Sequence, residues 1–212
     1  MNDGEKLYIW QSAHWPNWRY DLSALTGPLT EVSRAQGLLL GRLADVGMAL
    51  RDQASLAALT EDVVKTSEIE GEVLNMQSVR SSIARRMGVD IGAVAPVDRH
   101  VEGVVEMVLD ATTRATDPLT AERLFGWHAA LFPTGYSGMT RIEVGQWRTD
   151  AEGPMQVVSG HVGRRKVHFQ APPAQALAAE IDRFLAWANA ETGEPTLIKA
   201  GLAHLWFVTL HP

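Results

Sequence analysis

A histidine followed by a proline is the pair of residues in this chain best suited to acid–base chemistry. His211 follows an apolar stretch, 195–210, with hydrophobic residues on every side, which predicts a helix buried all round. Because the residue before a proline is pushed out of the α region, we expect this helix to break at His211. An imidazole titrates near neutral pH, so His211 could act as a general base. The alternative is that the His-Pro pair is only a helix stop.

A carboxylate near the end of another predicted helix is the second candidate. Thr66 and Glu70 are four residues apart and share a helix face, and Gly71 suits the left-handed position after a helix. A carboxylate is unfavourable there, because the helix dipole is negative at its C-terminus. We therefore expect another group to hold Glu70, and we expect Glu68 and Glu72 to point to other faces. The alternative is an exposed acidic face that water satisfies.

Several segments resemble the Fic family, whose signature reads H-P-F-x-D/E-G-N-G-R. His211-Pro212 matches the first two signature residues, and the remaining signature residues are absent from the 212. Thr66 to Gly71 fits the inhibitory pattern S/T-x-x-x-E-G/N of the same family. Further similar segments are 8–11, 15–21, 127–131, 145–148, 167–173 and 203–204. Together the matches span nearly the whole chain.

The resemblance implies an autoinhibited protein adenylyltransferase. His211 would deprotonate a Ser, Thr or Tyr hydroxyl of a target protein, which would attack the α-phosphate of ATP and expel pyrophosphate. Glu70 would pair with the signature arginine that otherwise contacts the γ-phosphate, so that ATP could not bind productively. The absent signature residues would bind the phosphates through backbone N–H groups and hold Mg²⁺. We therefore expect the complete protein to use ATP and Mg²⁺, and this 212-residue chain to be inactive and to bind neither well.

A β-hairpin is predicted late in the chain, because 155–159 and 166–170 are short and rich in β-branched residues. The two strands are joined across the loop 160–163. The resemblance implies that this hairpin is the flap of the family, which docks a segment of the target protein by main-chain pairing. The flap residues would be Lys166, Val167, His168 and Phe169. The alternative is an ordinary surface hairpin.

Helical periodicity dominates the rest of the chain. We expect one long helix with Pro28 in its first turn and Leu50 near its end, followed by a helix from about Gln53 to Gly71. Asn75 and Thr120 are predicted to cap two further helices. The predicted fold class is all-α, a Fic-like helical bundle with a small β-hairpin flap. The predicted domains are 1–95, an N-terminal helical region with the inhibitory helix, and 96–212, the Fic core.

Composition limits the partners and the compartment. The chain has no cysteine, which rules out disulfides and thiolate metal sites and makes the cytoplasm the default location. Lys199 and His204 interrupt the only long apolar run, so no membrane segment is expected. A net charge of −6 argues against nucleic acid as a partner. A homo-oligomer is compatible with the sequence.

Two questions stay open from the sequence. His204 and His211 share a helix face, but no Asp or Glu accompanies them on that helix, so we predict no metal site. The alternative to an enzyme is a non-enzymatic helical interaction or regulatory module. A DNA-binding regulator is a third interpretation, which the acidic net charge disfavours.

Overall fold

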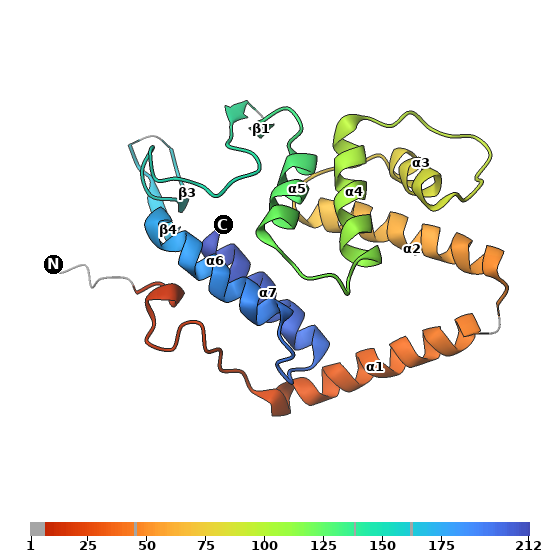
Figure 1. The fold of residues 1–212 in the computed structure, drawn as a ribbon, viewed down its shortest axis with the longest axis horizontal. Helices are drawn as coiled ribbons and strands as arrows, with labels where there is room; N and C mark the ends of the chain where they lie inside the picture. Colours follow the sequence, from red (N-terminus) through yellow and green to blue (C-terminus); the bar gives the residue numbers. More distant parts are fainter. Residues whose placement is uncertain (1–6, 45, 138, 162) are drawn as a thin grey trace. The chain divides into compact units, whose positions relative to one another are not determined.

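The computed structural model describes residues 7–44, 46–137, 139–161 and 163–212, and these residues form two compact units. The terminal unit consists of Met1–Leu29 and Gln146–Pro212, and the central unit of Thr30–Gly145. Helices dominate both units (Figure 1). In the described residues the strands form only two small antiparallel pairs. The predicted all-α class with a small hairpin is therefore confirmed.

The central unit is built around three helices that share one apolar core. Helix α2 (Met48–Ile69) contacts α3 (Met76–Met87) and α4 (Arg99–Thr113), as Figure 1 shows. Their inward faces supply most of the buried cluster: Leu56, Val63, Leu74, Val79, Ile83, Ala84, Val101, Val104 and Val105. These residues recur at helical spacing, so each helix turns one apolar stripe to the other two.

Helix α5 (Ala121–Leu131) packs closely on α4. The close approach requires a glycine on α4, since a Cβ at Gly103 would overlap the carbonyl oxygen of Ala130. A short antiparallel pair, β1 (Tyr136–Ser137) and β2 (Thr140–Arg141), follows α5. The backbone of α5 is thereby fixed against the core helix that precedes it.

The predicted helix caps are present. The side chain of Asn75 accepts a hydrogen bond from the N–H of Ser78 at 3.0 Å and so caps α3. The side chain of Thr120 accepts one from the N–H of Arg123 at 3.2 Å and caps α5. Gly88, with a φ of 69°, closes α3 in the left-handed conformation.

The boundaries of the first two helices differ from the prediction. Helix α1 spans Leu22–Ala44, so Pro28 lies inside the helix rather than in its first turn. The helix starts early because a carboxylate oxygen of Asp21 accepts hydrogen bonds from the N–H groups of Ser23 and Ala24, at 2.9 and 3.3 Å. Leu50 belongs to α2, which begins after Gly47.

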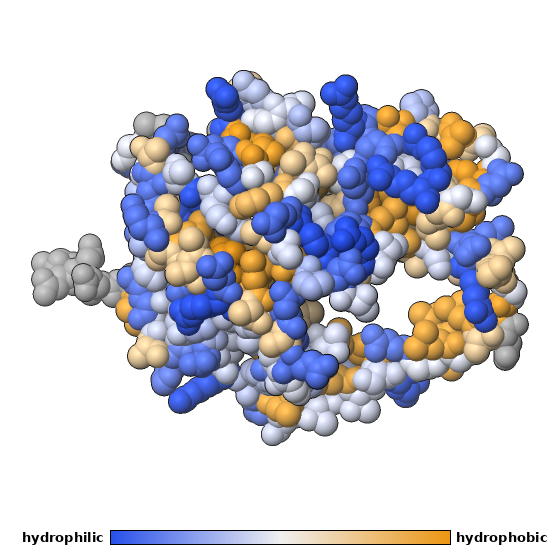
Figure 2. Space-filling model, viewed as in Figure 1, coloured by the Kyte–Doolittle hydropathy of each residue, from blue (hydrophilic) through white to orange (hydrophobic). Residues whose placement is uncertain are grey.

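The later part of α1 carries hydrophobic side chains that the central unit does not bury. Leu38, Leu39 and Leu40 are 51%, 58% and 68% exposed, and Figure 2 shows hydrophobic surface on this part of the helix. None of them joins the buried cluster of the central unit. The stability of that unit therefore comes from α2, α3 and α4.

The terminal unit pairs two helices with the predicted hairpin. Helix α6 (Ala174–Asn189) packs on α7 (Thr196–Leu210), and strand β3 (Gln156–Ser159) pairs antiparallel with β4 (Lys166–Gln170), as Figure 1 shows. The hairpin is thus confirmed at the predicted residues. Val162, in its loop, lies outside the described residues.

The N-terminal segment folds onto these elements through tryptophans. After a short 3₁₀ helix (Ile9–Gln11), the indole N–H of Trp15 donates to the carboxylate of Glu180 on α6 at 2.9 Å. The Trp15 ring also meets the ring of Trp206 on α7 edge to face, with centroids 5.9 Å apart. The indole N–H of Trp10 donates to the carbonyl of Gln170 at the end of β4, at 2.7 Å.

Helix α7 is not buried all round within the terminal unit. Trp206, Thr209 and Leu210 are buried, whereas Leu205 and Val208 are 39% and 40% exposed. The expectation that the helix over 195–210 is buried all round is therefore wrong within this unit, because α6 covers only one side of α7. Among the described residues, no helix combines the length and the hydrophobicity needed to cross a membrane.

Candidate functional site

The break predicted at His211 is present. Helix α7 ends at Leu210, and His211 has a φ of −140° and a ψ of 73°, outside the α region. Its N–H still donates to the carbonyl of Phe207 at 2.9 Å. The proline that follows explains why the helix stops here, since it disfavours the α conformation for the residue before it.

The imidazole of His211 is half-buried and oriented by a neighbouring ring. The rings of Phe207 and His211 stack with centroids 6.4 Å apart and planes only 9° from parallel. The two residues are four apart in sequence, so both rings lie on the same side of the helix end. The ring that could act as a base is therefore supported by a rigid element.

Arg148 connects the end of α7 to the start of α6. Its side chain is only 7% exposed. Nη2 donates to the carbonyls of Pro172 and Leu210, at 2.6 and 3.1 Å, and Nε donates to the Leu210 carbonyl at 3.4 Å. Nη1 pairs with Asp150 at 3.2 Å. Burial lowers the pKa of the Arg148 guanidinium and Asp150 opposes that shift, but a guanidinium stays protonated near neutral pH.

The predicted flap residues all lie on β4. Lys166 and His168 are exposed, whereas Val167 and Phe169 are half-buried, as expected for alternating faces of a strand. Phe169 packs edge to face on Tyr8, with centroids 5.4 Å apart. In the described part of the chain, β4 pairs with β3 alone, so its other edge is available to a further strand.

The end of α2 has the predicted glycine geometry. Gly71 has a φ of 86°, and its N–H donates to the carbonyl of Glu68 at 3.1 Å. The N–H of Glu72 donates to the carbonyl of Ser67 at 2.8 Å. These two bonds form a Schellman closure, in which backbone donors satisfy the last carbonyls of the helix. Glu70 is the C-cap residue and its side chain is exposed.

Thr66 and Glu70 line one cavity of about 420 Å³ within the central unit. Val104, Leu131 and Phe132 contribute to its apolar lining. Among the residues of this unit other than the undescribed 45 and 138, the Glu70 carboxylate has no hydrogen-bond or ion-pair partner. The structure therefore brings the two predicted inhibitory residues together beside an open space.

Two neighbouring acidic residues have different environments. Glu68 pairs with the ammonium of Lys65 at 2.8 Å on the exposed surface of α2. Glu72, in contrast, lines the same cavity as Glu70, and its carboxylate lies 3.9 Å from Nε2 of His100. The expectation that Glu72 points to another helix face is wrong, because α2 ends at Ile69 and the chain turns at Gly71.

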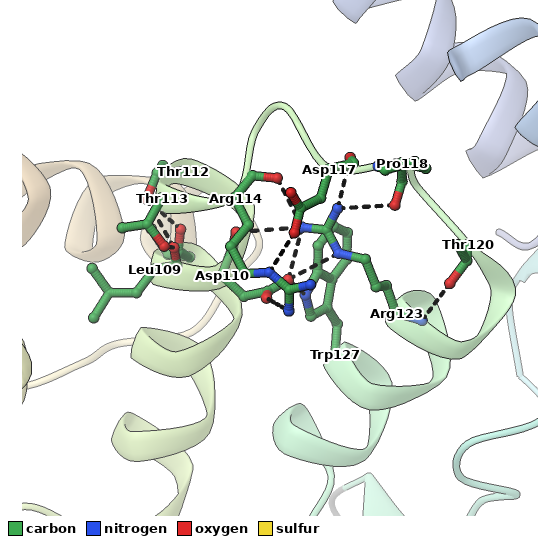
Figure 3. A network of polar contacts seen from close by, with 11 residues as sticks. Leu109, Asp110, Thr112, Thr113, Arg114, Asp117, Pro118, Thr120, Arg123 and Trp127 are labelled. Carbon is green, nitrogen blue, oxygen red and sulfur yellow. Dashed lines mark hydrogen bonds and ion pairs between the residues drawn. The ribbon is translucent and has the colours of Figure 1, made fainter.

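A charged network joins the C-terminal end of α4 to α5, the two helices that also supply Val104, Val108 and Leu131 to the cavity. Figure 3 shows this network. The Asp110 carboxylate accepts from Arg123 at 2.9 Å, from the indole N–H of Trp127 at 2.8 Å and from Arg114 at 3.0 Å. The hydrogen bond from Arg123 is the main reason why the pKa of Asp110 is lowered, and partial burial opposes it. The network thus connects α4 to α5 through polar contacts.

The described residues do not by themselves form a Mg²⁺ site, since no three His, Asp or Glu side chains among them are placed to share an ion. His100 and Arg148 have environments that the sequence did not reveal. No local sequence pattern marks His100 as a site residue. Arg148 stands out in the sequence only as part of the segment 145–148, which resembles the Fic family.

Two family models match parts of this chain. Residues 118–212 match the Fic/DOC family, and residues 8–89 match a domain of unknown function, DUF4172. The expected division of the chain near residue 95 falls between the two matched regions and stays a prediction.

One solved structure supports the Fic fold. It is a Fic family protein from Desulfovibrio desulfuricans G20, with a TM-score of 0.51 and 20% identity. The match covers 93% of this chain and 54% of the other, so this chain spans about half the length of that Fic protein. No curated protein matches.

Proposed function

We propose that the full-length protein transfers AMP from ATP to a Ser, Thr or Tyr hydroxyl of a target protein, and that Glu70 inhibits the transfer. The observation that carries this proposal is the Fic match of residues 118–212, which includes His211 at the end of α7. Because the chain spans about half of the solved Fic protein, the activity is proposed for the whole protein.

In this reaction His211 accepts the proton of the target hydroxyl. The hydroxyl oxygen then bonds to the α-phosphorus of ATP, and the bond from that phosphorus to the pyrophosphate oxygen breaks. A neutral imidazole is required, and the unperturbed pKa of histidine lies near the pH of the cell. The stack on Phe207 supports this role, because it holds the ring in one orientation.

The environment of Glu70 supports the inhibitory role. The carboxylate is exposed at the negative end of α2 and lacks a partner among the described residues of its unit, so a guanidinium would bind it favourably. In the Fic resemblance that guanidinium is the signature arginine, which would otherwise contact the γ-phosphate. Thr66 lines the same cavity one turn earlier, and Gly71 fixes where the helix ends.

The flap supports a role in target binding. Lys166, Val167, His168 and Phe169 lie on a strand with one unpaired edge in the described chain, and an extended peptide could add to that edge. The main-chain hydrogen bonds would hold a target segment without demanding a particular sequence. The partner proposed here is therefore an extended segment of a protein.

The experiment that tests the proposal is the transfer of α-labelled phosphate from ATP by the full-length protein. His211→Ala should lower the rate about 1,000-fold, the scale of general-base catalysis, and leave the melting temperature unchanged. His204→Ala is the matched control, because His204 is exposed on the same helix. If the His211→Ala protein keeps a substantial part of the activity, His211 is not the base.

A further inference from the structure

We propose that Arg148 is a positioning residue for His211, which it orients through the carbonyl of Leu210. This inference rests on the proposed function for its catalytic consequence, but the geometry itself lies within the terminal unit. Arg148 donates two hydrogen bonds to the carbonyl of Leu210, in the backbone that directly precedes His211.

Most hydrogen bonds of the Arg148 guanidinium go to main-chain carbonyls rather than to a carboxylate. Three of its hydrogen bonds go to the carbonyls of Leu210 and Pro172, and one goes to the Asp150 carboxylate. The last carbonyls of a helix lack intrahelical partners and form the negative end of its dipole. Leu210 supplies such a carbonyl at the end of α7, whereas the Pro172 carbonyl lies just before α6. The planar guanidinium presents five donors in a fixed fork, so Arg148 can bind both carbonyls and Asp150 at once.

The carbonyl of Leu210 and the N–H of His211 belong to one peptide group. That group is planar, so fixing both of its ends fixes its orientation. Arg148 holds the oxygen, and the N–H donates to the carbonyl of Phe207 at 2.9 Å. The peptide group thereby fixes where the Cα of His211 lies, and the φ of −140° then sets the direction in which the side chain leaves the backbone.

Asp150 holds the guanidinium in place. One carboxylate oxygen pairs with Nη1 of Arg148, and the other accepts from the N–H of Ala174 at 2.7 Å, at the start of α6. The start of α6 is thereby connected to the end of α7 through two buried side chains. A change at Arg148 should reach His211 without altering any group that binds ATP.

The test uses three variants of the full-length protein. Arg148→Met keeps the length of the side chain and removes every donor. Arg148→Met with Asp150→Asn also removes the carboxylate that would be left unpaired, and the Asn oxygen can still accept from Ala174. Arg148→Lys keeps the charge and can hold one carbonyl. We expect kcat to fall about 100-fold in the methionine variants and less in the lysine variant, while KM for ATP changes by no more than about twofold.

A second readout does not depend on activity. In ¹⁵N-histidine NMR spectra of the full-length protein, the His211→Ala variant assigns the His211 imidazole signals. Arg148→Met should shift and broaden those signals and leave those of His100 and His128, in the central unit, unchanged. If the methionine variants do not fold, Arg148→Lys is measured by the same two readouts.

Unchanged His211 signals together with unchanged kcat in a folded Arg148 variant would overturn the inference. A different failure belongs to the proposed function alone. If the wild-type protein transfers no AMP but the His211 signals respond to Arg148→Met, then Arg148 positions His211 and the assigned reaction is wrong.

Discussion

The ends of α2 and α7 each present a side chain with a proposed role in the reaction, but the two ends are held in different ways. At the end of α7, a side chain 62 residues away in sequence binds the last carbonyl, and the His211 ring stacks on Phe207. At the end of α2, Gly71 lets the backbone close on itself, and the Glu70 side chain takes no part in that closure. A base has to stay in one place, whereas an inhibitory group has to be able to leave.

This difference predicts which residues can be replaced without loss of the fold. The Schellman closure at Gly71 uses only backbone donors and acceptors, so removing the Glu70 carboxylate leaves every hydrogen bond of the helix end intact. Removing Arg148 instead leaves two buried carbonyls and one oxygen of the Asp150 carboxylate without the donor that Arg148 supplies.

The largest gain of activity is expected from Glu70→Gly. It should raise AMP transfer by the full-length protein about tenfold or more, a coupling typical of two communicating sites, because the signature arginine is released for the γ-phosphate. The measurement is the initial rate of transfer from α-labelled ATP at equal protein concentration.

Glu68→Gly is the control for that variant, since it removes the same charge from a residue that pairs with Lys65 on the surface. It should leave the rate unchanged. Glu72→Gly is not a neutral control, because Glu72 lines the same cavity as Glu70. If Glu68→Gly and Glu70→Gly change the rate equally, the effect comes from the negative charge near the helix end, and Glu70 has no specific inhibitory role.

The next effect concerns the charged network that joins α4 to α5. Asp110→Asn should lower the free energy of unfolding at pH 7 by about 2 kcal/mol, because charge-assisted hydrogen bonds from Arg123 and Trp127 weaken. Urea unfolding measures this change. Asp117→Asn, at a more exposed pair with Arg114, should cost less than about 1 kcal/mol.

The stability of the wild-type protein and that of Asp110→Asn should depend differently on pH. The pKa of Asp110 is lowered in the folded state, chiefly by the hydrogen bond from Arg123. Its contribution is therefore fully present above the unfolded pKa of about 3.9 and is lost as the pH falls through the folded value. Wild-type protein should lose stability in this acidic range more steeply than Asp110→Asn does. Parallel stability curves for the two proteins would show that the contacts of the Asp110 carboxylate do not stabilise the fold.

The smallest effect is expected from Gly71→Ala. A Cβ at this position meets no atom within 4 Å, so the cost is the left-handed conformation alone, about 1 kcal/mol of stability. Gly88→Ala is matched, since Gly88 also has a positive φ and open space around it. Thermal unfolding should show similar losses in both variants, but only Gly71→Ala should also raise AMP transfer. A rate that responds to both would point to general loosening of the unit.

Local sequence signals were sufficient for much of the fold. The caps at Asn75 and Thr120 and the left-handed position of Gly71 depend on a few neighbouring residues, and the structure has them where they were predicted. The break before Pro212 has the same local origin. The start of α1 was missed because Asp21 competes with Pro28 as a start signal, and the earlier cap prevails.

Features of the candidate site that depend on distant contacts could not be predicted. Nothing near Arg148 in the sequence indicates that its partner is the carbonyl of Leu210. His100 meets Glu72 only because α4 packs beside the end of α2. The burial of α7 was overestimated for a related reason, since an apolar composition does not tell which side a neighbouring helix covers.

The most direct test of the account follows label from ATP to protein in three forms of the full-length protein: wild type, Glu70→Gly and Glu70→Gly with His211→Ala. Each form is assayed with α-labelled and with γ-labelled ATP. The account predicts transfer of the α label only, faster in Glu70→Gly than in wild type, and abolished in the double variant. Transfer of the γ label, or α-label transfer that survives in the double variant, would contradict it.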